Sequence, residues 1–207
     1  MTQTTRPYHH GDLRASLVDA GLEATRIGGP SSLVLRDVTR RVGVSANAAY
    51  RHFDDREALL AAVAVEILAR VAKGMAPAEP VNGTERTRAL ERLRSVGLGY
   101  IDFARREPGW FSVVFFGWRT GEAVATPPPG PFVALTDALD AMVAAGALSE
   151  ARRDGAEWLC WSAVHGFAEL VLRGPLRDAP CDMVDHLAAR TVDAIIAGLD
   201  ATCDHRQ

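Results

Sequence analysis

The sequence contains few cysteines and no long apolar run. Its 207 residues include three cysteines, Cys160, Cys181 and Cys203, which lie far apart without CxxC spacing. This spacing excludes a disulfide framework and indicates a reducing compartment. No apolar stretch approaches the roughly 20 residues that span a bilayer, and the polar N-terminus lacks the apolar region of a signal peptide. We therefore expect a cytoplasmic protein that does not enter a membrane.

Sequence signatures of enzymes and metal sites are also missing. The chain contains no GxSxG, P-loop, HExxH or glycine-rich dinucleotide fingerprint. His9-His10, Cys181/His186 and Cys203/His205 are isolated pairs, without the spacing of a metal-ligand set. We therefore predict no enzyme activity, no metal and no cofactor.

The composition is that of a globular protein, with 48% apolar and 24% charged residues. The formal net charge of −3 gives no overall basic signature of a nucleic-acid binder. Residues 1–60 carry eight arginines and seven acidic residues, and the rest of the chain is more acidic. This asymmetry is mild, and charge alone does not decide the function.

Helical periodicity dominates the sequence, and the period-two alternation of half-buried strands is missing. Glycine and proline divide the chain into segments of helical length. The sequence therefore predicts an all-α fold of about nine helices. The expected helices span residues 12–27, 36–42, 46–53, 55–73, 84–106, a short segment from 108, 132–145, 150–173 and 182–202.

Two of these segments, 36–42 and 46–53, are short and separated only by Gly43-Val44-Ser45. Gly43 allows the positive φ that ends a helix, and Ser45 is a favourable N-cap for the next one. Two short helices joined by a three-residue turn that contains glycine match a helix-turn-helix. The same pattern also fits plain packing of two helices in an all-α protein.

In a helix-turn-helix the second helix lies in the major groove of DNA, with its N-terminal residues at the base edges. Asn47 carries an amide that can bridge adenine N6 and N7, and alanines beside it allow close approach. Tyr50, Arg51, His52 and Arg56 supply donors for phosphate oxygens. The predicted DNA-binding residues are Ser45, Ala46, Asn47, Ala49, Tyr50, Arg51, His52 and Arg56.

The segment LRDVTRRVGVSANAAYRHFDDREALLAAV (35–63) resembles the DNA-binding segment of TetR-type (tetracycline-repressor-like) transcriptional regulators. The resemblance rests on Leu35-Arg36, Gly43-Val44-Ser45, Tyr50-Arg51-His52-Phe53 and Arg56-x-x-Leu59. YHHGDLR (8–14) and WLCWSAVHGFAELVLRG (158–174) further resemble a subgroup with a Trp–His–Gly-bearing C-terminal domain.

The chain departs from the family pattern at three positions. Thr39 stands where alanine is usual, Ala48 where many members carry a phosphate-binding threonine, and Arg56 where lysine is common. These departures put single contacts in doubt, but not the resemblance.

The resemblance implies a ligand-responsive regulator, more often a repressor, that binds palindromic double-stranded DNA as a homodimer and is released by a small-molecule effector. It implies a helix-turn-helix domain over residues 8–54 and an effector-binding and dimerisation domain over 55–204. The alternative is a helical ligand-binding module, or an enzyme, that has kept the fold without operator binding.

Aromatic residues are concentrated in two places beyond residue 63. Plain core packing explains such clusters in many helical proteins. The family resemblance favours a second interpretation, a mostly apolar effector pocket with a few polar groups. His165 is then either a polar contact for the effector or a core histidine bonded to a backbone carbonyl. The predicted ligand-binding residues are Tyr100, Phe103, Trp110, Phe111, Trp161 and His165.

The helix predicted around residue 165 is apolar on two faces, which is typical of a helix between its own domain and a partner subunit. Gly166 allows close helix approach. By resemblance, the last two helices form a four-helix interface between two copies. The predicted interface residues are Val164, Gly166, Leu170, Leu187, Ile195 and Leu199.

Overall fold

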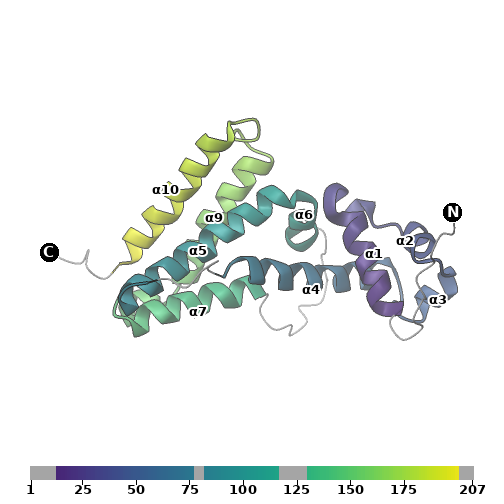
Figure 1. The fold of residues 1–207 in the computed structure, drawn as a ribbon, viewed down its shortest axis with the longest axis horizontal. Coiled ribbons are helices and arrows are strands. Elements are labelled where there is room, and N and C mark those ends of the chain that lie inside the picture. The colour runs from purple at the N-terminus through teal and green to yellow at the C-terminus, as the bar shows by residue number, and fades with distance from the viewer. Residues whose placement is uncertain (1–12, 77–81, 117–129, 201–207) are drawn as a thin grey trace. The chain divides into compact units, whose positions relative to one another are not determined.

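The computed structural model describes residues 13–76, 82–116 and 130–200, and every regular element within these ranges is helical (Figure 1). The all-α prediction is therefore confirmed for the described part of the chain. The elements are α1 (Leu13–Gly28), the 3-10 helix η1 (Pro30–Ser32), α2 (Leu35–Val42), α3 (Ala46–Tyr50), α4 (Arg56–Gly74), α5 (Glu85–Arg106), α6 (Pro108–Phe116), α7 (Gly130–Ala144), α8 (Glu150–Arg153), α9 (Ala156–Leu172) and α10 (Cys181–Leu199).

These ranges contain ten α-helices where the sequence predicted about nine, because the segment expected as one helix over 150–173 is divided into α8 and α9. Gly155 has φ 73°, a left-handed conformation in which a right-handed helix cannot continue. α3 also ends earlier than expected, at Tyr50. The N–H groups of His52 and Phe53 both bond to Ala49 O, at 2.9 and 3.0 Å, and close a turn there.

The other helix boundaries agree with the expected ones to within a few residues. Asp55 Oδ1 accepts from the N–H of Ala58 at 2.7 Å, which confirms Asp55 as the cap of α4. The predicted end of the last helix at residue 202 and the outer domain limits at 8 and 204 lie outside the described residues.

The described residues divide into two compact units. The first unit contains α1, η1, α2, α3, α4 up to Ile67, and α6 from Gly109. Within it, α1 contacts η1, α2 and α3. Its core is made of fully or almost fully buried apolar side chains, among them Leu17, Leu22, Leu33, Val38, Ala49, Phe53, Leu59, Leu60 and Phe111.

The second unit contains the rest of α4 and α5, α7, α8, α9 and α10. α5 contacts α7, α9 and α10, and α9 contacts α10 (Figure 1). A Cβ on Gly97 would lie 3.1 Å from Val192 Cγ2, so the glycine allows α5 and α10 to pack closely. α5, α9 and α10 thus pack around a shared core, where the second candidate site lies.

Candidate functional site

The turn between α2 and α3 has the geometry of a helix-turn-helix. Gly43 ends α2 with φ 79° and ψ 30°, and its N–H bonds to Thr39 O at 2.9 Å. Val44 N–H bonds to the same oxygen at 3.0 Å, as in a helix C-cap with left-handed glycine. Ser45 then caps α3, and its Oγ accepts from the N–H of Ala48 at 3.3 Å. Gly43 and Ser45 therefore have the conformations that the sequence predicted.

α3 and the residues that flank it present most of the predicted DNA-binding side chains to solvent. Asn47 and Tyr50 lie on the same side of the helix at i and i+3, and Tyr50 is 51% exposed. Arg51 and His52 follow in the turn after the helix. The exposed members of the predicted set are Ser45, Ala46, Asn47, Tyr50, Arg51 and His52.

Ala49 and Phe53 lie on the inner side of the same segment. Ala49 is 0% exposed and Phe53 is 4% exposed, and the Arg14 guanidinium stacks over the Phe53 ring at 5.0 Å. Ala49 therefore does not belong to the solvent-facing set, because its methyl group fills the core of the first unit. The two buried side chains fix which face of α3 points outward.

Thr39 is buried at 4% exposure, where the TetR pattern usually has alanine. Its Oγ1 donates to Arg36 O at 3.0 Å, one turn earlier in α2. The hydroxyl group is therefore satisfied within its own helix, and it does not need to separate the two short helices.

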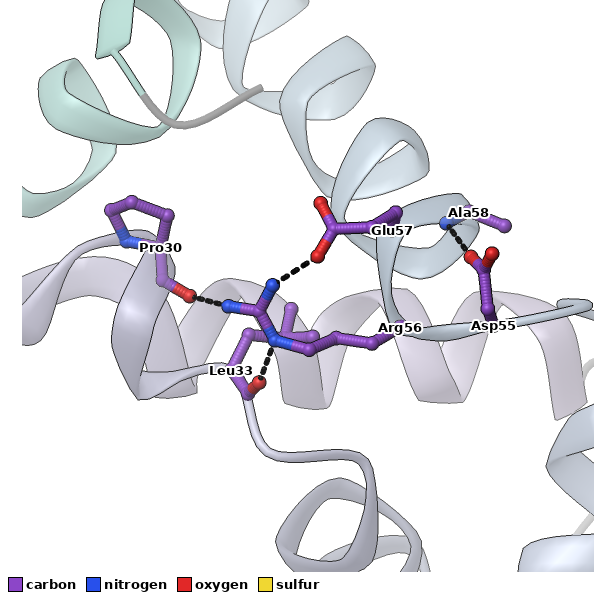
Figure 2. A network of polar contacts seen from close by, with 6 residues as sticks. All are labelled: Pro30, Leu33, Asp55, Arg56, Glu57 and Ala58. Carbon is purple, nitrogen blue, oxygen red and sulfur yellow. Dashed lines mark hydrogen bonds and ion pairs between the residues drawn. The ribbon is translucent and has the colours of Figure 1, made fainter. Parts of the chain in front are cut away.

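Arg56 differs from the other predicted DNA-binding residues. Its Nε donates to Leu33 O at 2.8 Å, and its Nη2 donates to Pro30 O (Figure 2). Its Nη1 forms an ion pair with Glu57. These carbonyl partners could not be predicted from the sequence, because a backbone acceptor more than 20 residues away leaves no trace in a local motif.

The second candidate site is a small cavity inside the second unit, between α5, α7, α9 and α10. Its volume is about 30 Å³ and its surface is apolar. Of the six predicted ligand-binding residues, Tyr100 and Trp161 line it, with their rings in an edge contact at 5.3 Å. The other lining residues are Met75, Leu93, Val96, Gly97, Pro131, Leu135, Cys160, Val164, Val192, Ile195 and Ile196.

Tyr100 also forms a part-buried polar pair with His165. Its Oη lies 2.8 Å from His165 Nδ1, so one partner of His165 is a side chain. Burial raises the pKa of Tyr100, and the charge of Glu169 adds to this. Burial lowers the pKa of His165, Glu169 opposes this and Arg173 reinforces it. Both groups are therefore neutral near pH 7, and in the tautomer protonated on Nε2, Nδ1 accepts the Tyr100 hydroxyl hydrogen.

Trp110 and Phe111 belong to the first unit and are not among the residues that line this cavity. Trp110 Nε1 donates to Leu22 O at 2.9 Å, and Phe111 is 0% exposed with its ring 4.7 Å from that of Phe115. Their expected place in one pocket with Tyr100 is thus not seen, because α6 packs into the core of α1–α4. Phe103 is half-buried on α5 and does not line the cavity either.

Cys160 is a cavity residue that the sequence did not indicate. It is 5% exposed, and burial raises the pKa of its thiol to about 11. The thiol is therefore protonated at neutral pH and contributes to the wall as a small apolar group. Periodicity predicts that one face of a helix is buried, but it does not predict that the buried faces enclose a cavity.

The six predicted interface residues fall into two groups. Val164 and Leu199 are buried within the chain, at 9% and 5% exposure, and Val164 and Ile195 line the cavity. These three side chains face the interior of the second unit. By contrast, Gly166 and Leu170 are exposed on α9, and Leu187 is half-buried on α10.

Two other kinds of site are absent from the described residues. No helix in those ranges is long and apolar enough to cross a bilayer. Within the same residues, no group of three histidine, cysteine or acidic side chains could hold a metal ion.

A short helix-turn-helix followed by a helical unit with an internal apolar cavity is the architecture of all-α transcriptional regulators. Comparison with known protein families identifies which family of regulators this chain matches. The profile described as "Bacterial regulatory proteins, tetR family" matches residues 17–63, and that described as "Tetracyclin repressor-like, C-terminal domain" matches residues 93–195. The chain belongs to the TetR family of transcriptional regulators.

Solved structures share this fold over almost the whole chain. A protein of unknown function from Rhodococcus sp. RHA1 is 25% identical, with a TM-score of 0.69, and the match covers 95% of this chain and 100% of that one. A TetR variant from Acinetobacter baumannii AYE in complex with minocycline is 23% identical, with a TM-score of 0.58, over 89% and 94% of the two chains.

The transcriptional regulator FadR from Bacillus subtilis, in complex with stearoyl-CoA, is 15% identical, with a TM-score of 0.66, over 89% and 98%. No curated protein matches the sequence significantly. The similarity to the Trp–His–Gly subgroup stays a prediction.

Proposed function

We propose that this regulator is a repressor that binds palindromic operator DNA as a homodimer and is released by a small-molecule effector. The observation that carries the proposal is the division of α3 into two faces. Ala49 and Phe53 anchor the segment in the core, whereas Asn47, Tyr50 and Arg51 are exposed together. Residues 8–54 would bind DNA, and residues 55–204 would bind the effector and the partner.

The exposed residues have separate roles in this proposal. Asn47 reads a base edge, because its amide offers one donor and one acceptor that match adenine. Tyr50, Arg51 and His52 donate to phosphates and set the register. In a two-fold dimer the two α3 helices would enter successive major grooves about 34–36 Å apart.

The test is selection of DNA from a randomised pool, followed by titration of the selected sequence at several salt concentrations. We expect an enriched palindrome and a log affinity that falls linearly with log salt, because phosphate contacts release counterions. If no sequence is enriched at about 0.1 M salt, the chain does not bind an operator and the DNA-binding proposal is wrong.

The effector proposed for the second unit is a predominantly apolar molecule. The cavity walls are apolar, and the Tyr100–His165 pair is the polar group next to them. Pockets for drug-sized ligands measure about 300–1,000 Å³, far more than the volume of about 30 Å³ found here. Side chains around the cavity must therefore move when an effector enters. The effector would then bind the rearranged state more tightly than the closed state, and release from DNA requires this difference in affinity. The ligands of the TetR and FadR relatives support a site for large organic molecules in this fold.

Cys160 offers a direct test of this site. Compounds that raise Tm in a thermal-shift screen should also slow alkylation of Cys160, because it lies in the cavity wall. The exposed Cys181 is the internal control, and its reaction rate should not change. Equal protection of both thiols, or protection of neither, would place the ligand elsewhere.

The proposed dimer forms through α9 and α10. Gly166 and Leu170 are exposed on α9, and a Cβ at Gly166 or Gly198 would meet nothing within 4 Å in this chain. Leu159 and Met183 add exposed apolar surface, at 60% and 49%. Small residues beside exposed apolar ones allow the close approach of helices from a second copy.

A further inference from the structure

The guanidinium group of Arg56 lies against the connection between α1 and α2 (Figure 2). Arg56 is the first residue of α4, while its acceptors, Pro30 O and Leu33 O, belong to the first residue of η1 and to the residue that follows η1. Together with the Glu57 ion pair, these contacts engage all three guanidinium nitrogens. All four residues lie in the first unit.

These contacts are unfavourable for a role as a phosphate ligand. A guanidinium has five N–H donors in a planar fork, and a bidentate phosphate contact uses two that point the same way. Here each nitrogen already donates to a protein oxygen, and Glu57 offsets the positive charge. Arg51, in the turn after α3, is exposed and is the arginine proposed above as a phosphate ligand.

The segment that Arg56 holds leads directly into the helix-turn-helix. Leu33 is 0% exposed, and the next residue, Val34, accepts from the N–H groups of Asp37 and Val38 at 2.9 and 3.1 Å, which begins α2. Arg56 therefore attaches the start of α4 to the start of α2. The neighbouring Asp55 caps α4 and fixes the position from which the Arg56 side chain extends.

We propose that Arg56 is a positioning residue: it holds α2 and α3 in the orientation that fits the operator, and it does not contact phosphate. The inference rests on the proposed DNA binding. It predicts a change in specific affinity without a change in the number of phosphate contacts.

The test compares Arg56→Ala, Arg56→Lys and Arg51→Ala on the DNA selected by the wild-type protein and on unrelated DNA. All titrations run from 50 to 200 mM salt, well below Tm. Arg56→Ala should lower operator affinity about tenfold, as expected for the loss of one charge-assisted hydrogen bond, with an unchanged salt slope and unchanged binding to unrelated DNA. Arg51→Ala should reduce the slope by about 1 and weaken binding to both DNAs.

Arg56→Lys separates charge from geometry. A phosphate contact would survive this change, because lysine also binds phosphate as a point charge. A positioning role requires N–H groups directed at two carbonyls, which lysine does not supply in the same geometry. We therefore expect the operator affinity of Arg56→Lys to fall to within threefold of the affinity of Arg56→Ala. Near-wild-type binding by Arg56→Lys, or a slope reduced by about 1 in Arg56→Ala, would overturn the proposal.

Two controls exclude a general loss of stability. Val113→Ala removes methyl groups from a fully buried side chain of the first unit, so it should lower Tm and leave operator affinity intact. If Arg56→Ala behaves in the same way, Arg56 is only structural and the proposal is wrong. Arg106→Ala removes an exposed arginine of the second unit and should change neither affinity nor slope.

Hydrogen exchange of the free protein tests the attachment without DNA. Arg56→Ala should speed exchange in residues 30–38, and Arg51→Ala should not. This measurement tests whether Arg56 holds residues 30–38 even if the wild-type protein selects no DNA. A lack of DNA selection would refute the proposed function separately. Unchanged exchange in residues 30–38 would refute the attachment itself.

Discussion

Tyr100 Oη and His165 Nδ1 lie 2.8 Å apart and connect α5 to α9 at the edge of the apolar cavity. Tyr100 is 1% exposed, so its hydroxyl group has little access to water. This pair is therefore a polar group beside the apolar wall of the cavity. It also stabilises the second unit in the absence of any ligand.

Tyr100→Phe should lower the free energy of unfolding by about 0.5–1.5 kcal/mol, because it removes the hydroxyl group that bonds to His165 Nδ1. Urea unfolding of Tyr100→Phe, His165→Leu and the double variant measures the coupling. We expect the double variant to be more stable than the sum of the single changes predicts. Strict additivity would mean that the hydrogen bond contributes nothing.

The lowered pKa of His165 predicts a loss of stability in acid. The unfolded chain binds a proton on this histidine near its ordinary pKa of about 6.5, whereas the folded chain binds it only at lower pH. Between these values the unfolded state holds more protons, so stability rises with pH and is lost as the pH falls below about 6.5. His165→Gln should flatten this part of the curve. Equal pH profiles for His165→Gln and wild type would contradict the assignment.

Local signals account for the parts of the fold that the sequence predicted. Gly43, Ser45 and Asp55 each act on backbone groups within three or four residues, so their roles can be read without tertiary structure. Gly155 is a signal of the same kind. Its left-handed conformation divides α8 from α9, where the sequence predicted one helix.

Tertiary packing accounts for what the sequence did not predict. The aromatic pattern predicted that Trp110 and Trp161 both line the pocket. Of the two, only Trp161 lines the cavity, because α6, which carries Trp110, packs with α1. α9 is apolar on two faces, and composition does not say that Val164 points inward while Leu170 points outward. Arg56 has its partners more than 20 residues away, where periodicity carries no information.

Gly43→Ala tests the backbone of the turn. Because φ is 79° and a Cβ would meet nothing within 4 Å, the cost is purely conformational, about 1–2 kcal/mol of unfolding free energy. Gly43→Asn should cost less, since asparagine tolerates the left-handed region. Urea unfolding gives both values, and an alanine variant as stable as wild type would contradict the turn geometry.

Leu170→Asp tests the proposed dimer. This side chain is 43% exposed on α9, so a carboxylate should be tolerated in a single chain but not when buried against a second copy. Light scattering after gel filtration should give the dimer mass for wild type and the monomer mass for Leu170→Asp. Val133→Asp, at a 39% exposed position on α7, is the matched control and should stay dimeric. A monomeric wild type would contradict the dimer itself.

Asn47→Ala tests how the operator is read. Asn47 is exposed near the start of α3, between the small side chains of Ala46 and Ala48, so few other groups can reach a base edge. We expect its loss to cost about 1–3 kcal/mol at one base pair, seen as relaxed selection at a single position of each half-site. Tyr50→Phe is the comparison, because the loss of a phosphate donor should weaken binding to all sequences alike. If Asn47→Ala selects the same sequences as wild type, Asn47 reads no base, and specificity would come from DNA shape.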